Sequence, residues 1–228
     1  RLPTGSVTAL SYGWWIQQVP ETLIGTAIAT ALLPTLAEHA AAGEEGPFRE
    51  TVERSLRVMI ALSLPITAIL SLTSLPWIQA AFGFPLEDAQ MILWATQGYL
   101  IGLLGHSVVE LGVRAFYARQ NARIPMLVSG LGFLVYTGLA LLLMSPWGAG
   151  GIALANSISY SIQALILILV LNRQIPERLK FWKTLVRSAA GMVLAGGAAW
   201  LIFSVLPIPL PALVLSLAGM LLDRKSVV

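Results

Sequence analysis

The chain has 228 residues, of which 57% are hydrophobic and only 11% are charged, and its mean hydropathy is +0.79. Because soluble domains carry about 25% charged residues, this composition excludes a water-exposed surface over most of the chain and indicates an integral membrane protein. The net charge of +3 is too small to indicate nucleic-acid binding, and the absence of cysteine excludes disulfides and thiolate sites.

Six segments are long and apolar enough to cross a bilayer, which requires about 20 residues each. The sequence therefore predicts an all-α fold, a polytopic membrane helix bundle with six transmembrane helices and a truncated seventh that begins near Pro209. Interior prolines, Pro20 and Pro65 among them, predict kinks, which either border a cavity or only serve packing. The six predicted spans are Gly5–Glu38, Phe48–Ala81, Leu86–Arg119, Pro125–Met144, Gly150–Leu171 and Leu185–Leu206.

The first span carries the most polar side chains, gathered around Pro20. At three- and four-residue steps, Ser11, Trp15, Gln18, Thr22 and Gly25 share one helix face. Such a stripe indicates either a water-filled cavity or a tight contact between helices. The residues that we assign to a candidate substrate cavity are Trp15, Gln17, Gln18, Glu21 and Thr22.

The segment after the first span reads as an amphipathic helix. Pro47 marks a helix start, and Phe48, Val52 and Leu56 then follow four residues apart on one face. This pattern predicts a helix that lies at the membrane surface before the second span begins.

The third span contains His106 and Glu110, which are four residues apart and therefore on one helix face. They form either a proton relay or, as we favour, a packing pair. Tryptophans near the span ends predict interfacial anchors; they are Trp77, Trp94, Trp147 and Trp182.

Loops that contain lysine or arginine alternate strictly with loops that contain neither. The loops after the first, third and fifth spans contain eleven of them, and the intervening loops contain none. Arginines are retained on the cytoplasmic side of a membrane, so Arg114, Arg119 and Arg123 predict a cytoplasmic loop and fix the side of every other loop. The first span then starts outside the cell, so we expect an odd number of helices upstream of this sequence. The other eight residues of the count are Arg49, Arg54, Arg57, Arg173, Arg178, Lys180, Lys183 and Arg187.

Motifs of enzymes, cofactor sites and metal sites are missing from the sequence. The two histidines, His39 and His106, lie far apart, and no phosphate-binding glycine loop or serine-nucleophile motif occurs. We therefore expect a protein without catalytic residues, cofactor or metal.

Three stretches together resemble the MurJ/MviN lipid II flippase family. They are Gly25–Glu38 followed by Phe48-Arg-x-x-x-x-Arg54, then Arg114-Ala-Phe-Tyr-Ala-Arg-Gln-Asn-Ala-Arg-Ile-Pro125, and Gly150-Gly-Ile-Ala-Leu-Ala-Asn-Ser-Ile-Ser159. The resemblance implies a fourteen-helix exporter of the multidrug/oligosaccharidyl-lipid/polysaccharide superfamily, represented here by helices eight to thirteen and part of fourteen. It divides the chain into a lobe at 1–175 and two helices at 176–222 that form a groove for a lipid tail. We expect 223–228, which read as a translated sequencing adapter, to be non-native.

The resemblance also implies a function. The family moves an undecaprenyl-pyrophosphate-linked peptidoglycan precursor across the bacterial inner membrane by alternating access, in contact with the bilayer and with possible partners in cell-wall synthesis. Trp15 and Gln18 replace an arginine and an acid typical of the family, and Tyr136 and Ala140 replace residues linked to sodium. Two alternatives therefore stay open: a flippase for another lipid-linked oligosaccharide, and a non-transporting membrane scaffold.

Overall fold

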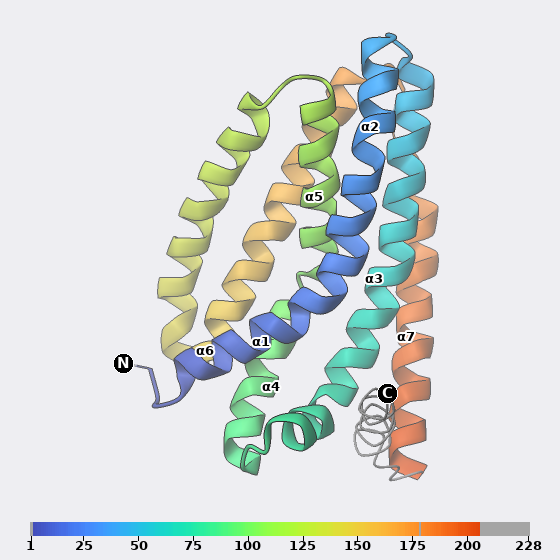
Figure 1. Cartoon of the computed structure of the whole chain (residues 1–228). Coiled ribbons are helices and arrows are strands. Elements are labelled where there is room, and N and C mark those ends of the chain that lie inside the picture. The colour runs from blue at the N-terminus through green and yellow to red at the C-terminus, as the bar shows by residue number, and fades with distance from the viewer. Residues whose placement is uncertain (1, 178, 206–228) are drawn as a thin grey trace, which may run out of the picture.

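The first predicted span is one long, bent helical rod. In the computed structural model, which describes residues 2–177 and 179–205, it comprises α1 (Ser6–Glu21), the π-helical turn η1 (Thr22–Thr26) and α2 (Ala27–Ala41) (Figure 1). Pro20 lies inside α1 and has no backbone N–H, so the regular hydrogen-bond ladder fails there. The wider π turn follows directly, as such turns do where an α-helix is locally disturbed. The predicted disturbance at Pro20 is therefore present.

The third predicted span is broken into two helices. After α3 (Glu45–Phe82), α4 (Leu86–Leu100) and α5 (Leu103–Ala118) meet at an angle of 42°. The Ser157 hydroxyl donates hydrogen bonds to the carbonyl oxygens of Gly98 (2.6 Å) and Tyr99 (3.0 Å) beside this break. The Tyr99 carbonyl also accepts the Gly102 backbone N–H at 2.9 Å, so the Ser157 hydroxyl adds a link from α6 to the end of α4 beside the break.

The 52-residue helix α6 (Arg123–Gln174) is a hairpin of two arms. A straight helix of that length would extend about 78 Å, more than twice the hydrocarbon core of a bilayer. Gly148 breaks it with φ 56° and ψ −134°, a conformation open to glycine because it has no Cβ. Figure 1 shows the two arms diverging from this turn, and the Ser159 hydroxyl donates to the Gly132 carbonyl across them at 2.7 Å. The arms correspond to the two predicted spans 125–144 and 150–171.

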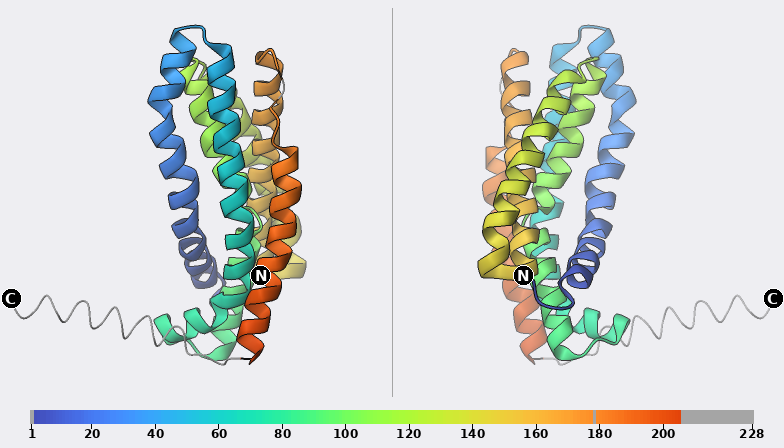
Figure 2. Two further views of the ribbon diagram at one scale, coloured as in Figure 1. Left: turned by 90° about the vertical axis from the view of Figure 1, so that its right-hand side faces the viewer. Right: turned by 90° about the vertical axis from the view of Figure 1, so that its left-hand side faces the viewer.

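The helix α7 (Trp182–Val205) packs along α3 (Figure 2). By length and composition, four helices of the described residues are able to cross a membrane, or five when α4 and α5 count as one bent span. The second arm of α6 completes the six predicted spans. The seventh span near Pro209, the tail 223–228 and the remainder of the predicted 176–222 unit lie outside the described residues, and the division at 175/176 stays a prediction.

The prediction of a surface-lying helix at Phe48–Leu56 is wrong. This segment is the first part of α3, which continues without interruption into the span and reaches beyond the start of α7 (Figure 2). Phe48, Val52 and Leu56 are at most 1% exposed and belong to the main hydrophobic core with α2, α5 and α6. Other helices, rather than lipid, cover the apolar face that the sequence revealed. We call the end of the bundle where α2 is followed by α3, α5 by α6 and α6 by α7 the basic end, because the arginines and lysines counted above lie in or near these three connections.

Candidate functional site

A polar cluster joins the first rod to α5 and α6 inside the bundle. Glu21, at the end of α1, is half-buried, and its carboxylate accepts a hydrogen bond from Thr26 of η1 at 3.4 Å. It lies within electrostatic range of two side chains of α5, Glu110 and Arg114. Burial in an apolar bundle makes each such charge costly unless it is paired.

Arg114 provides the positive charge of this cluster. Its guanidinium forms an ion pair with Glu110, one turn earlier on α5, and donates to the Thr30 hydroxyl of α2 at 3.4 Å. Two carboxylates, those of Glu21 and Glu110, therefore interact with a single arginine. The prediction that Arg114 belongs to a loop is wrong, because it lies within α5, which ends only at Ala118.

His106 is 4% exposed and has partners from two other helices. It hydrogen bonds to the Asn156 side chain through Nε2 at 3.0 Å, and its ring stacks on Tyr160 with centroids 3.6 Å apart. Trp14 of α1 contacts the same imidazole edge-on at 5.7 Å. The predicted pair of His106 with Glu110 is thus wrong, because each residue has another partner. Both α6 partners are at least 50 residues away, so helical spacing gave no signal for them.

The predicted cavity residues separate into an outward and an inward group. Trp15 is 56% exposed, and Gln18 and Thr22 are also exposed on the same side of the rod. We call Trp15, Gln18 and Thr22 the α1 polar stripe. Glu21 lies at its border, half-buried, whereas Gln17 is 0% exposed and its amide atoms have no hydrogen-bond partner. The structure therefore removes Gln17 from the candidate cavity wall.

Arg119 and Arg123 lie at the basic end, where α5 turns into α6. Arg119 binds the Glu45 carboxylate with both guanidinium nitrogens, at 2.9 and 2.8 Å, and stacks over the Phe48 ring at 5.2 Å from its centroid. Arg123 is exposed and is the first residue of α6. Across residues 2–177 and 179–205, no three His, Asp or Glu side chains gather as metal ligands.

Comparison with known proteins identifies the family. The family described as "Lipid II flippase MurJ" matches residues 1–215. A probable lipid II flippase MurJ of Bdellovibrio bacteriovorus is 30% identical over 86% of this chain and 38% of its own length. The corresponding protein of Rhizobium meliloti is 31% identical over 98% of this chain and 44% of its own length. This chain thus spans less than half the length of these curated relatives.

A solved structure agrees with the fold. A lipid II flippase MurJ in an inward closed conformation superposes with a TM-score of 0.71 at 20% identity, covering 89% of this chain and 47% of the solved one. The helix arrangement described above is therefore that of a known flippase structure, and the match over residues 1–215 fixes the relationship in sequence. The chain belongs to the lipid II flippase MurJ family.

Proposed function

We propose that this chain is part of a transporter that moves lipid II, the undecaprenyl-pyrophosphate-linked peptidoglycan precursor, across the bacterial inner membrane. The family match over residues 1–215 carries this proposal. The apolar helices, by their length and composition, support a multi-pass location in that membrane. Moving an intact lipid requires no covalent step, so the proposal involves neither catalytic residues nor a cofactor.

The α1 polar stripe is our candidate for one wall of the substrate path. Its amide and hydroxyl groups donate and accept hydrogen bonds, and the Trp15 ring offers a flat face, so the stripe suits sugars better than lipid tails. Polar side chains at membrane depth face protein or a water-filled cavity rather than lipid. Exposure of Trp15, Gln18 and Thr22 on this bundle therefore supports a cavity on that side. Glu21 borders the stripe and links it to the polar cluster.

Complementation tests this function. The locus encoding this chain, with its native flanking sequence, is introduced into a bacterium depleted of its own lipid II flippase. We expect restored growth, and weaker growth with Gln18→Ala because a hydrogen-bonding group of the stripe is lost. Gln90→Ala removes another exposed amide, from α4, and should leave growth unchanged. If the wild-type protein is inserted in the membrane and growth is still not restored, the proposal is contradicted.

A second candidate is transport of another lipid-linked oligosaccharide. It is favoured by the absence of charge from the exposed stripe, which presents Trp15, Gln18 and Thr22. A pyrophosphate calls for cationic partners, whereas sugars are bound by aromatic and amide groups. Deleting the gene in its own host distinguishes the candidates: accumulated lipid II supports the first, and a different accumulated lipid-linked saccharide supports the second.

A further inference from the structure

A second candidate site lies at the basic end, where α3, the connection after α6 and α7 meet. A pocket of about 570 Å³ is lined there by four basic residues, Arg57, Lys180, Lys183 and Arg187, together with Trp182. No acidic residue is among its described lining residues. The volume falls within the range of about 300–1,000 Å³ typical of small-molecule sites. Such a concentration of positive charge favours an anionic ligand.

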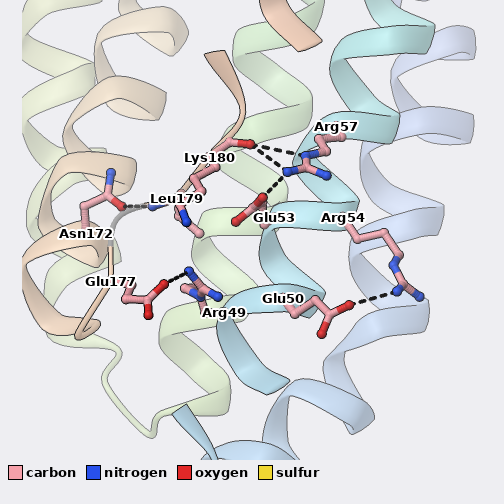
Figure 3. A network of polar contacts seen from close by, with 9 residues as sticks. All are labelled: Arg49, Glu50, Glu53, Arg54, Arg57, Asn172, Glu177, Leu179 and Lys180. Atoms are coloured by element: carbon pink, nitrogen blue, oxygen red, sulfur yellow. Dashed lines mark hydrogen bonds and ion pairs between the residues drawn. The ribbon is translucent and has the colours of Figure 1, made fainter. Parts of the chain in front are cut away.

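The neighbouring carboxylates pair with only one of these four basic residues, because Glu53 binds Arg57 while Glu50 and Glu177 bind arginines that do not line the pocket. Figure 3 shows this network, in which the Arg57 guanidinium also donates to the Lys180 carbonyl at 3.0 and 3.2 Å. Within the described part of the chain, Lys180, Lys183 and Arg187 form no ion pair. The three occupied pairs are Glu50 with Arg54, Glu53 with Arg57, and Glu177 with Arg49.

The start of α7 strengthens the positive potential of this pocket. The helix begins at Trp182, and the first backbone N–H groups of a helix have no partner within it. Together with the helix dipole they favour an anion. Lys183 and Arg187 follow one turn apart, so they lie on the same face of α7 and add their charge on one side.

The position of Trp182 indicates the depth of the pocket in the bilayer. Trp182 is 69% exposed where the apolar length of α7 begins, which is the position of an interfacial tryptophan. The distribution of lysine and arginine assigns this end of the bundle to the cytoplasm. A lipid of that leaflet places its headgroup at the pocket and its chains beside α7.

We propose that this pocket binds the phosphate group of a lipid in the cytoplasmic leaflet. Basic pockets between membrane helices on this side accommodate anionic headgroups. Two lipids present that chemistry, an anionic phospholipid and a polyprenyl diphosphate. Binding of an anionic phospholipid is independent of the transport function proposed above, whereas binding of a polyprenyl diphosphate rests on it, because that group is part of the proposed substrate.

Native mass spectrometry of the purified chain in detergent tests this proposal. The probes are phosphatidylglycerol, undecaprenyl diphosphate and, as the zwitterionic comparison, phosphatidylcholine. We expect at least one anionic lipid to bind more tightly than phosphatidylcholine. Because each basic residue near a charged surface contributes measurably, Lys183→Gln/Arg187→Gln should weaken that binding about tenfold or more. The anionic lipid that is retained identifies the source of the phosphate.

A double variant with the same loss of charge provides the control. Arg123→Gln/Arg173→Gln removes two exposed arginines of the basic end that do not line the pocket, and it should change binding less than about twofold. Equal losses in both double variants, or no preference over phosphatidylcholine, would overturn the proposal. Lys180→Gln, which lies in the connection rather than in α7, repeats the test should the α7 variant fail to fold.

Discussion

At the residue scale, Arg119 ties the connection after α5 to the start of α3. Its two hydrogen bonds to Glu45 and its contact with the Phe48 ring are lost together in Arg119→Ala. Hydrogen bonds between charged groups contribute about 1.5–3 kcal/mol when shielded from water. Because Glu45 is partly exposed, we expect Arg119→Ala to lower the free energy of unfolding by only about 1–2 kcal/mol. Thermal unfolding in detergent measures it. Arg54→Ala breaks the exposed pair with Glu50 and should cost less than about 0.5 kcal/mol; equal losses would contradict the assignment.

Gln17 presents the opposite case, a buried amide without partners. An unpaired buried amide loses its hydrogen bonds to water without compensation, at about 1–3 kcal/mol. We therefore expect Gln17→Leu, which is of similar size, to raise the midpoint of thermal unfolding. Gln90→Leu, at an exposed position of α4, should leave the midpoint nearly unchanged. A Gln17→Leu variant less stable than wild type would show that the amide is paired.

At the element scale, the break between α4 and α5 depends on close contact with α6. A Cβ on Gly102 would lie 2.7 Å from the Cα of Ser157, a backbone atom that cannot turn away. Gly102→Ala should therefore destabilise the fold by about 1–3 kcal/mol. A Cβ on Gly138, in the first arm of α6, would meet no heavy atom of another residue within 4 Å, so Gly138→Ala should be neutral or stabilise by up to about 1 kcal/mol. Denaturant unfolding of both variants compares them.

The elements show where sequence reasoning succeeds. The second predicted span, Phe48–Ala81, differs from α3 by only a few residues at its ends. This agreement arises because the length of an apolar segment is determined by consecutive residues of the sequence. The 42° break was not predicted, because no proline marks it and its hydrogen-bonding partner, Ser157, lies about 60 residues later. The core position of Phe48 was missed for a related reason. Periodicity reveals an apolar face, but tertiary packing decides whether lipid or protein covers it.

The same limit applies to the candidate site. The sequence identified a polar face on the first span, and the structure places Trp15, Gln18 and Thr22 together on it. Nothing local indicated that Gln17 faces inward, or that His106 pairs with Asn156. Such contacts arise only when α1, α5 and α6 assemble.

At the scale of the whole molecule, the charge distribution predicts the orientation in the membrane. Because the chain has no cysteine, single cysteines report the side of a loop without further engineering. Ala42→Cys, at the basic end, should react with a membrane-impermeant maleimide only after the cells are permeabilised. Glu87→Cys, at the exposed start of α4, should react in intact cells. The reverse pattern would refute the orientation derived from the lysine and arginine count.

The packing of α7 along α3 has a mechanical consequence. Among the described elements, α3 is the principal neighbour of α7, whereas α5 contacts the first rod, α3 and α6. Under a pulling force applied at residue 205, α7 should peel away along one seam while the remaining spans hold together. Single-molecule force spectroscopy in a bilayer would then record an early, separate rupture about 24 residues long, the length of α7, before the main body yields. Because the polar cluster joins the first rod to α5 and α6, and α7 contacts chiefly α3, this rupture should leave the cluster intact.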